Sequence, residues 1–250
     1  MTVLLLGTKN RGKIAEATEL LADVDGLELL AFTDRPFSDV DETGDTFLAN
    51  ALLKARSISE ETGLPVLSED AGLEVDGLDG APGVRSARFA GEPVDYARNN
   101  VLLLEKLRGV FDRRARFVAV AALRLPDGQT FITTGALHGT ITERLVGEGG
   151  FGYDPLFVPA GHAKTLAEMS LPEKNRISHR KRALTRMRPV LIDLLAAGEL
   201  YPPRSATGNT PRDECRATRT VRCARASPAI RRTPRARDAA SRRASMGPQP

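Results

Sequence analysis

The sequence predicts an α/β fold in which helices flank an elongated, mixed β-sheet. Three observations lead to this prediction. Strand-like and helix-like segments alternate over the first 200 residues. Residues 3–6 form a short, continuous apolar run that ends at Gly7, as in a strand buried on both faces. The turn at residues 126–128, Pro-Asp-Gly, separates two further strand-like segments, which is typical of an antiparallel hairpin.

The first half of the chain contains two predicted helices between short strands. Apolar residues recur at helical spacing over residues 14–21, behind Asn10 as a candidate N-cap. Residues 27–32 predict a second strand. Residues 45–62 place their apolar side chains on one face of a helix, and the Gly-Leu-Pro sequence at residues 63–65 stops it. A third strand follows directly.

The second half adds antiparallel strands between two more helices. Residues 95–107 have a helical pattern, and residues 116–125 and 130–138 form the two arms of the hairpin. Residues 178–197 predict a closing helix that Pro189 is expected to kink. We find no internal repeat of fixed period.

The length and composition of the chain limit how many domains it can form. The 250 residues are 41% hydrophobic and 27% charged, enough for a buried core. We expect one domain over residues 1–200 and an Arg-, Pro- and Ala-rich tail over residues 201–250. The tail has too few apolar side chains to offset its ordering entropy, so we expect it to be disordered.

No run approaches the roughly 18 apolar residues of a membrane helix, so no membrane contact is expected. Both cysteines, Cys215 and Cys223, lie in the tail, which favours a reducing, cytoplasmic location.

The net charge of +4 averages two unlike segments. Residues 201–250 hold 12 arginines against 3 acids, a net of +9, whereas residues 1–200 carry 24 bases against 29 acids, a net of −5. The tail could contact nucleic acid or another polyanion. A solvated appendage is the favoured alternative, because the aromatic side chains that interleave basic residues in nucleic-acid binders are missing.

The first turn is a candidate anion site. Residues 7–13 fit the GxxxxGK pattern of a phosphate-binding loop, but Ile14 stands where that loop needs Ser or Thr to hold magnesium. A P-loop NTPase is therefore disfavoured. Backbone N–H groups at a helix start, beside Lys9, Arg11 and Lys13, would still suit phosphate. An ordinary basic loop is the alternative.

Two acidic segments are candidate magnesium sites. Glu42 lies among acids just before the second helix, where N-capping alone would also explain them. Glu69 and Asp70 come immediately after the strand that starts at residues 65–67, at the edge where such sheets place ligands. A charged turn is the alternative. Asn50 and Lys54 are four residues apart and share a helix face, which could also be plain solvent exposure.

Two later segments are candidate base-binding sites. Glycines surround Phe151, so the backbone could approach a flat ligand while the ring stacks on a base. A ligand-free glycine turn is the alternative. Lys174, His179 and Arg180 gather donors at the start of the closing helix. Apart from Cys215 and Cys223, no His or Cys pair has zinc-ligand spacing, the GxSxG elbow is absent, and the first predicted strand is not followed by a GxGxxG fingerprint.

The order of these segments resembles that of the noncanonical purine nucleoside triphosphate pyrophosphatases, which are inosine triphosphatase-like enzymes or XTP/dITP diphosphatases. The resemblance covers residues 2–198. It rests on Thr8-Lys9-Asn10-Arg11-Gly12-Lys13, Glu42-Thr43-Gly44 with Thr46-Phe47 and Asn50-Ala51, Asp70-Ala71-Gly72-Leu73, Gly80-Ala81-Pro82-Gly83 with Ser86-Ala87-Arg88, Phe151-Gly152-Tyr153-Asp154-Pro155, and Ser178-His179-Arg180.

The resemblance implies a two-lobed fold with an active-site cleft, a homodimer, and hydrolysis of ITP, dITP or XTP to the monophosphate and pyrophosphate with Mg²⁺. Residues 1–200 would be a nucleotide pyrophosphatase domain. Asp70 would be the general base, and Asp70, Glu42 and Glu69 the magnesium ligands. The implied substrate-binding residues are Thr8, Lys9, Asn10, Arg11, Gly12, Lys13, Asn50, Lys54, Ala71, Phe151, Gly152, Tyr153, Asp154, Lys174, His179 and Arg180.

Within that set, the first-turn residues with Asn50 and Lys54 would hold phosphates, and the remainder would hold the base. Hypoxanthine and xanthine present a 6-oxo acceptor where adenine presents an amino donor, so adenine would leave cationic donors unpaired. The chain departs from the family at Ala71, often Ser or Thr, and at Ala49, often Glu. Two other classes stay open: a P-loop-like kinase or GTPase, and a nucleic-acid binder that acts through its tail.

Overall fold

The computed structural model of the protein describes residues 1–200 and 222–223. Its helices are α1 (Arg11–Leu21), α2 (Phe47–Thr62), α3 (Tyr96–Lys106), α4 (Leu171–Ile177) and α5 (His179–Ala196). Its strands are β1 (Thr2–Leu6), β2 (Leu27–Leu30), β3 (Val66–Val75), β4 (Arg114–Arg124), β5 (Thr130–Ile141), β6 (Phe157–Pro159) and β7 (Arg222–Cys223).

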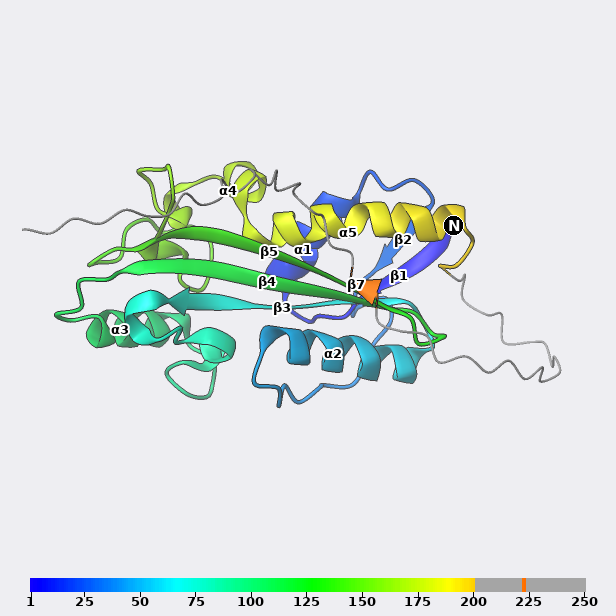
Figure 1. Cartoon of the computed structure of the whole chain (residues 1–250), viewed down its shortest axis with the longest axis horizontal. Coiled ribbons are helices and arrows are strands. Elements are labelled where there is room, and N and C mark those ends of the chain that lie inside the picture. The colour runs from blue at the N-terminus through cyan, green and yellow to red at the C-terminus, as the bar shows by residue number, and fades with distance from the viewer. Residues whose placement is uncertain (201–221, 224–250) are drawn as a thin grey trace, which may run out of the picture.

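The sheet is mixed, as the sequence predicts. Its strand order is β2-β1-β3-β4-β5-β6, with the two-residue β7 paired in parallel to β5. β1 pairs in parallel with β2 and with the start of β3, whereas β3 to β6 pair antiparallel. The long strands β3, β4 and β5 run through the length of the molecule (Figure 1).

Helices cover both faces of this sheet. In Figure 1, α1 and α5 lie over one face and α2 and α3 over the other. A core that includes Leu21, Leu123 and Met187 fills the space between the sheet, α1 and α5. A separate core at the far ends of β3, β4 and β5 contains Leu103 of α3 and Phe157 of β6. The two cores make the two lobes that the resemblance implies.

Local side chains fix where the helices begin. Asn10 caps α1 by accepting a hydrogen bond from the Lys13 amide at 3.1 Å, which confirms its predicted role. Asp95 and Ser178 cap α3 and α5 in the same way. At its other end α2 stops at Gly63, whose φ of 70° is the left-handed conformation that favours glycine. α5 continues through Pro189.

Three predicted boundaries are wrong. β3 does not end near residue 67 but continues to Val75, so Glu69 and Asp70 lie inside a strand and not after it. Both hairpin strands extend beyond the predicted arms, at Arg114 and at Ile141. The closing helix is confirmed as α5, but a further helix, α4, precedes it that the sequence did not predict, and Ser178 separates the two with extended backbone.

Among the described residues, no helix combines the length and the apolar character needed to cross a bilayer. The tail predicted to be disordered lies outside the described residues, apart from β7.

Candidate active site

A cavity of about 430 Å³ opens beside β3 at the point where its neighbour β1 stops. β1 pairs with β3 only through Leu5 and Leu6. Among the described residues, no strand pairs with that edge of β3 beyond Leu67, so a ligand can reach side chains from both faces of the sheet. The cavity is lined by Asp70 and Ala71 of this free edge.

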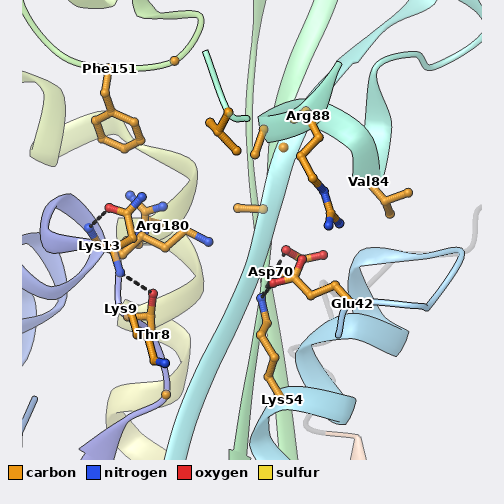
Figure 2. Close-up of a pocket in the computed structure, with 18 of the residues that line it drawn as sticks. Thr8, Lys9, Lys13, Glu42, Lys54, Asp70, Val84, Arg88, Phe151 and Arg180 are labelled. Atoms are coloured by element: carbon orange, nitrogen blue, oxygen red, sulfur yellow. Dashed lines mark hydrogen bonds and ion pairs between the residues drawn. The ribbon is translucent and has the colours of Figure 1, made fainter. Parts of the chain in front are cut away.

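Strand geometry separates the two adjacent acids. Successive residues of a strand point to opposite faces, and Glu69 contacts Arg180 of α5 whereas Asp70 contacts Asn50 and Lys54 of α2. The cavity therefore has two walls. We call the α2 side the Asp70 wall and the α1/α5 side the Glu69 wall. Figure 2 shows the two groups of side chains to either side of the β3 ribbon.

On the Asp70 wall, one ammonium group joins two carboxylates. Lys54 Nζ lies 2.7 Å from Glu42 Oε1 and 3.4 Å from Asp70 Oδ1. Asn50 Nδ2 donates to Asp70 Oδ2 at 3.2 Å. Burial raises the pKa of Asp70 above its usual range, the Lys54 charge opposes that rise, and nearby Glu42 adds to it. For Glu42, burial acts to raise the pKa, but the charge and hydrogen bond of Lys54 and the charges of other nearby cations together lower it.

Helix α2 places these side chains. Asn50 and Lys54, four residues apart, project from one face of the helix as their spacing predicts. Asn50 Oδ1 accepts from the Gly44 amide at 2.7 Å, which directs its amino group to Asp70. A Cβ at Gly44 would lie 2.7 Å from Asn50 Oδ1, so the loop before α2 needs glycine for this close approach.

On the Glu69 wall, buried charges form a closely paired network. Arg180 binds Glu69 through two hydrogen bonds of 2.7 and 2.9 Å and also binds Glu16 of α1. Lys174 Nζ lies 2.7 Å from Asp154 and 3.6 Å from the same Glu16. Burial alone would raise the pKa of Glu69, but the charge and hydrogen bonds of Arg180, together with the Lys13 charge, lower that pKa to about 2.

His179 is a neutral member of this wall. Burial lowers its pKa to about 3, and its ring stacks on Phe117 with 5.0 Å between centroids. His179 Nδ1 is buried and has no hydrogen-bond partner among the described residues. The free nitrogen is available to a ligand in the cavity.

The first turn forms the floor between the walls. Thr8 Oγ1 accepts from the Asn10 amide at 3.2 Å, which shapes the turn. Lys9 pairs with exposed Asp39 at 2.7 Å and lies over the Phe32 ring. Burial lowers the pKa of Lys13, whose ammonium lies 3.8 Å from Glu69 Oε1. Its charge faces the cavity (Figure 2).

The glycine-rich loop brings Phe151 to the far side of the cavity. Asp154 Oδ2 accepts from the Phe151 amide at 2.9 Å and from Lys174, and burial raises the pKa of Asp154 although Lys174 opposes it. Lys174 Nζ lies 4.4 Å from the Phe151 ring centre. Gly150 has φ of 73°, and a Cβ there would lie 2.1 Å from Asp154 Oδ2. The loop thus needs its glycines to hold Phe151 next to Lys174.

The cavity gathers most of the residues that the sequence singles out. The exceptions are Arg11, Gly12, Asn50 and Glu69, which are not among its lining residues. Gly12 lies under Phe151, because a Cβ there would be 3.3 Å from the phenyl ring. Asn50 and Glu69 act on lining residues through their contacts with Asp70 and Arg180.

Comparison with known proteins identifies the family of this chain. The sequence profile of the Ham1 family matches residues 4–190. The chain belongs to the Ham1 family. A Ham1 protein from Coxiella burnetii has 39% identity and a TM-score of 0.72, over 77% of this chain and 100% of that one.

Relatives of this Ham1-family chain include named enzymes. A protein called dITP/XTP pyrophosphatase from Streptomyces coelicolor is 48% identical over 78% of this chain and 100% of its own length. One from Thermus thermophilus with the same name is 50% identical over 72% of this chain and 87% of its own. The solved structure of a dITP/XTP pyrophosphatase from Mycobacterium abscessus has 42% identity and a TM-score of 0.63, over 76% and 99% of the two chains.

Sequence reasoning missed two residues of the site in this Ham1-family chain. Glu16 is 2% exposed and binds both Arg180 and Lys174. The sequence feature that could have identified Glu16 is its position next to Ala17 on the apolar face of α1, where a carboxylate is unexpected. Asn100 of α3 donates from Nδ2 to the Gly152 carbonyl at 3.0 Å and so supports the Phe151 loop. Its partner is 52 residues away, and no local pattern reveals it.

Proposed function

We propose that this Ham1-family chain hydrolyses dITP, XTP and ITP to the monophosphate and pyrophosphate. The observation that carries the proposal is the cavity beside β3, where a desolvated carboxylate, Asp70, lies beside cations and Phe151 lines the far side. Relatives that are 48% and 50% identical bear the name dITP/XTP pyrophosphatase.

The proposed substrate pose follows from the charges. The triphosphate lies over the floor formed by residues 8–13, between the Asp70 wall and Lys13. Helix α1 begins there, and its first N–H groups favour an anion. The base enters between Phe151 and the Glu69 wall. This pose places the phosphate chain next to Asp70 and Lys54, as an attack on the α–β anhydride requires.

Asp70 is the proposed general base. Its carboxylate, with a raised pKa, accepts a proton from water more readily than an ordinary aspartate. Asn50 holds one oxygen at 3.2 Å and Lys54 the other at 3.4 Å, so the orientation of the carboxylate is fixed. The oriented water attacks the phosphorus, and the anhydride bond to pyrophosphate breaks.

Magnesium is the proposed cofactor, held by Glu42 and Asp70. The donor set fits, because magnesium takes one or two carboxylates together with substrate phosphates and water, and these two carboxylates already converge on Lys54. When bound, Mg²⁺ supplies charge stabilisation for the pyrophosphate that leaves. Within residues 1–200 there is no group of three or more metal-binding side chains, so phosphate oxygens would complete the site. Glu69, also a candidate ligand, faces Arg180 from the opposite wall.

Base selection is assigned to the Glu69 wall. Arg180 uses three of its N–H groups on Glu69 and Glu16, which leaves two of the five that a guanidinium carries. Lys174 and His179 add further polar groups. A 6-oxo group can accept from these donors, whereas the amino group of adenine leaves them unpaired.

We further propose that residues 1–200 form one catalytic domain that works as a homodimer in the cytoplasm. Relatives match the first four fifths of the chain over their full length. Phe111 is fully exposed on a loop between α3 and β4 and would be covered in a dimer. The absence of cysteines from residues 1–200 supports a reducing compartment.

A nucleotide panel tests the function. Purified protein is given dITP, XTP, ITP, ATP and GTP with magnesium, and pyrophosphate and orthophosphate are measured separately. We expect pyrophosphate from the first three and little from ATP. Orthophosphate from ATP or GTP would favour the kinase or GTPase alternative. Loss of turnover with a chelator, restored by added magnesium, tests the cofactor.

A further inference from the structure

Among the described residues that line the cavity, Arg88 is the cation to which the proposed function gives no role. It closes the 3-10 helix Gly83–Arg88, in a block that the sequence analysis singled out without a function. The side chain lines the cavity. Figure 2 shows its guanidinium directed from above toward Asp70 and Glu42, across from Lys54.

The charge of Arg88 is weakly engaged by protein. In the part of the chain that the structure describes, its carboxylate partner is Glu92, with Nη1 and Oε1 3.5 Å apart. Both side chains are exposed, at 42% and 72%, and such pairs contribute little to stability. The charge nevertheless lies at the cavity, because the Arg88 side chain is part of its lining.

Two other cations of the cavity are paired more closely than Arg88, and one resembles it. Lys54 is held by Glu42 and Asp70, and Arg180 by Glu69 and Glu16. Lys13, on the opposite wall, has its nearest carboxylate oxygen at 3.8 Å. Arg88 and Lys13 thus face the cavity from opposite sides with charge available to an anion.

The backbone beneath Arg88 is firmly held although its side chain is not. Asn99 of α3 donates to the Ala87 carbonyl at 2.9 Å and accepts from the Ala90 amide at 2.7 Å. Tyr153 donates its hydroxyl to the Ser86 carbonyl at 2.8 Å. The guanidinium therefore starts from a fixed point, which reduces the entropy lost when it binds a ligand.

We propose that Arg88 is a substrate-binding residue that grips the phosphate chain from the Asp70 wall, opposite Lys13. A guanidinium offers a planar fork of N–H groups that matches two phosphate oxygens. Placed beside the carboxylates, it offsets the repulsion between them and the incoming triphosphate. The assignment rests on the proposed function and extends it to a second cation that clamps the same chain.

The test compares Arg88→Ala and Arg88→Lys with a matched control, Arg85→Ala. Arg85 is an exposed arginine of the same 3-10 helix that does not line the cavity. Two quantities are measured for each variant: kcat/KM for dITP by pyrophosphate release, and the affinity for inorganic tripolyphosphate by calorimetry with magnesium present.

We expect Arg88→Ala to lose about 10- to 100-fold in both quantities, the range of one charge-assisted contact. Arg88→Lys should recover part of the loss, since it keeps the charge without the fork. Arg85→Ala should stay within about twofold of the unchanged protein, because a surface charge outside the cavity contributes little. Glu92→Gln, which frees Arg88, should not reduce either quantity.

The outcomes separate this inference from the function itself. If the unchanged protein releases pyrophosphate but Arg88→Ala matches Arg85→Ala in either quantity, the role of Arg88 is wrong and the function stands. If no nucleotide is hydrolysed but Arg88→Ala alone loses tripolyphosphate affinity, the function is wrong and the phosphate site stands. No measurable tripolyphosphate binding by the unchanged protein would overturn the assignment.

Discussion

The two walls of the cavity use neighbouring acids in opposite ways. On the Glu69 wall, the carboxylate makes two short hydrogen bonds to Arg180, and its pKa falls to about 2. On the Asp70 wall, the carboxylate shares one ammonium with Glu42 at 3.4 Å, and its pKa rises. Glu69 and Asp70 are consecutive in the sequence, yet Glu69 is held as an anion whereas Asp70 can accept a proton.

The opposite pKa shifts of Glu69 and Asp70 indicate different roles for the two walls. A carboxylate with a strongly depressed pKa is a poor base and a good fixed counter-charge. Glu69 therefore holds Arg180 in place, and through Glu16 the same network reaches Lys174. Asp70, less completely paired and beside the cavity, is suited to chemistry. We expect substitutions on the Glu69 wall to affect stability and base selection, and substitutions on the Asp70 wall to affect turnover.

The largest effect is expected from Asp70→Asn. The change keeps the shape of the side chain and removes the base, so turnover of dITP should fall by at least about 1,000-fold, within the range of general-base catalysis. The free energy of unfolding should hold or rise, because the ionised carboxylate is desolvated in the folded state. Steady-state pyrophosphate release and urea denaturation measure the two quantities.

The matched control for that substitution is Glu74→Gln. Glu74 lies on the same strand, is partly exposed and pairs with Arg116 at 2.6 Å away from the cavity. Its turnover should equal that of the unchanged protein. Retained turnover in Asp70→Asn would remove Asp70 from the base role.

Glu69→Gln should produce the largest loss of stability. It leaves the Arg180 guanidinium, which is 3% exposed, with Glu16 as its nearest counter-charge. Breaking a buried ion pair by removing one partner costs about 3–5 kcal/mol of unfolding free energy. Urea denaturation measures it, and Glu74→Gln, which breaks a more exposed pair, should lose under about 1 kcal/mol. Equal losses in the two variants would contradict the contrast between the walls.

Acid should separate the two carboxylates with opposite signs. The pKa of Glu69 falls from 4.5 to about 2 on folding, so its stabilising effect is present above about pH 4.5 and is lost as the pH falls toward 2. The pKa of Asp70 rises on folding, so its ionised form destabilises the fold, and acid removes that effect.

Unfolding free energies between pH 7 and pH 3 test these signs. The deficit of Glu69→Gln relative to the unchanged protein should shrink as the pH falls, and so should any gain of Asp70→Asn. His179, whose pKa drops to about 3, also weakens the fold in acid, but it is present in all three proteins. A deficit of Glu69→Gln that grows in acid would show that Glu69 is not locked as an anion.

Sequence analysis could not predict most of the difference between the Glu69 wall and the Asp70 wall. The helices and strands follow from local periodicity and caps, and the motifs around Thr8, Asp70 and Phe151 do converge on one cavity. The sequence did not predict that β3 continues to Val75, because Ser68, Glu69 and Asp70 resemble a polar turn after an apolar run. Only their partners make them strand residues, and the Arg180 that neutralises Glu69 is 111 residues away.

The smallest effect is expected from removing the tail. Within the described part of the chain, the residues that line the cavity lie between 7 and 180, and a relative matches 78% of this chain over 100% of its own length. A chain ending at residue 200 should therefore keep its kcat/KM for dITP within about twofold, since its site contacts are unchanged. Lost turnover would place part of the tail at the site. The same pair of proteins tests the nucleic-acid alternative by measuring RNA affinity at several salt concentrations. If the affinity weakens with salt and disappears on truncation while turnover persists, residues 201–250, with their net charge of +9, have a binding role separate from both walls.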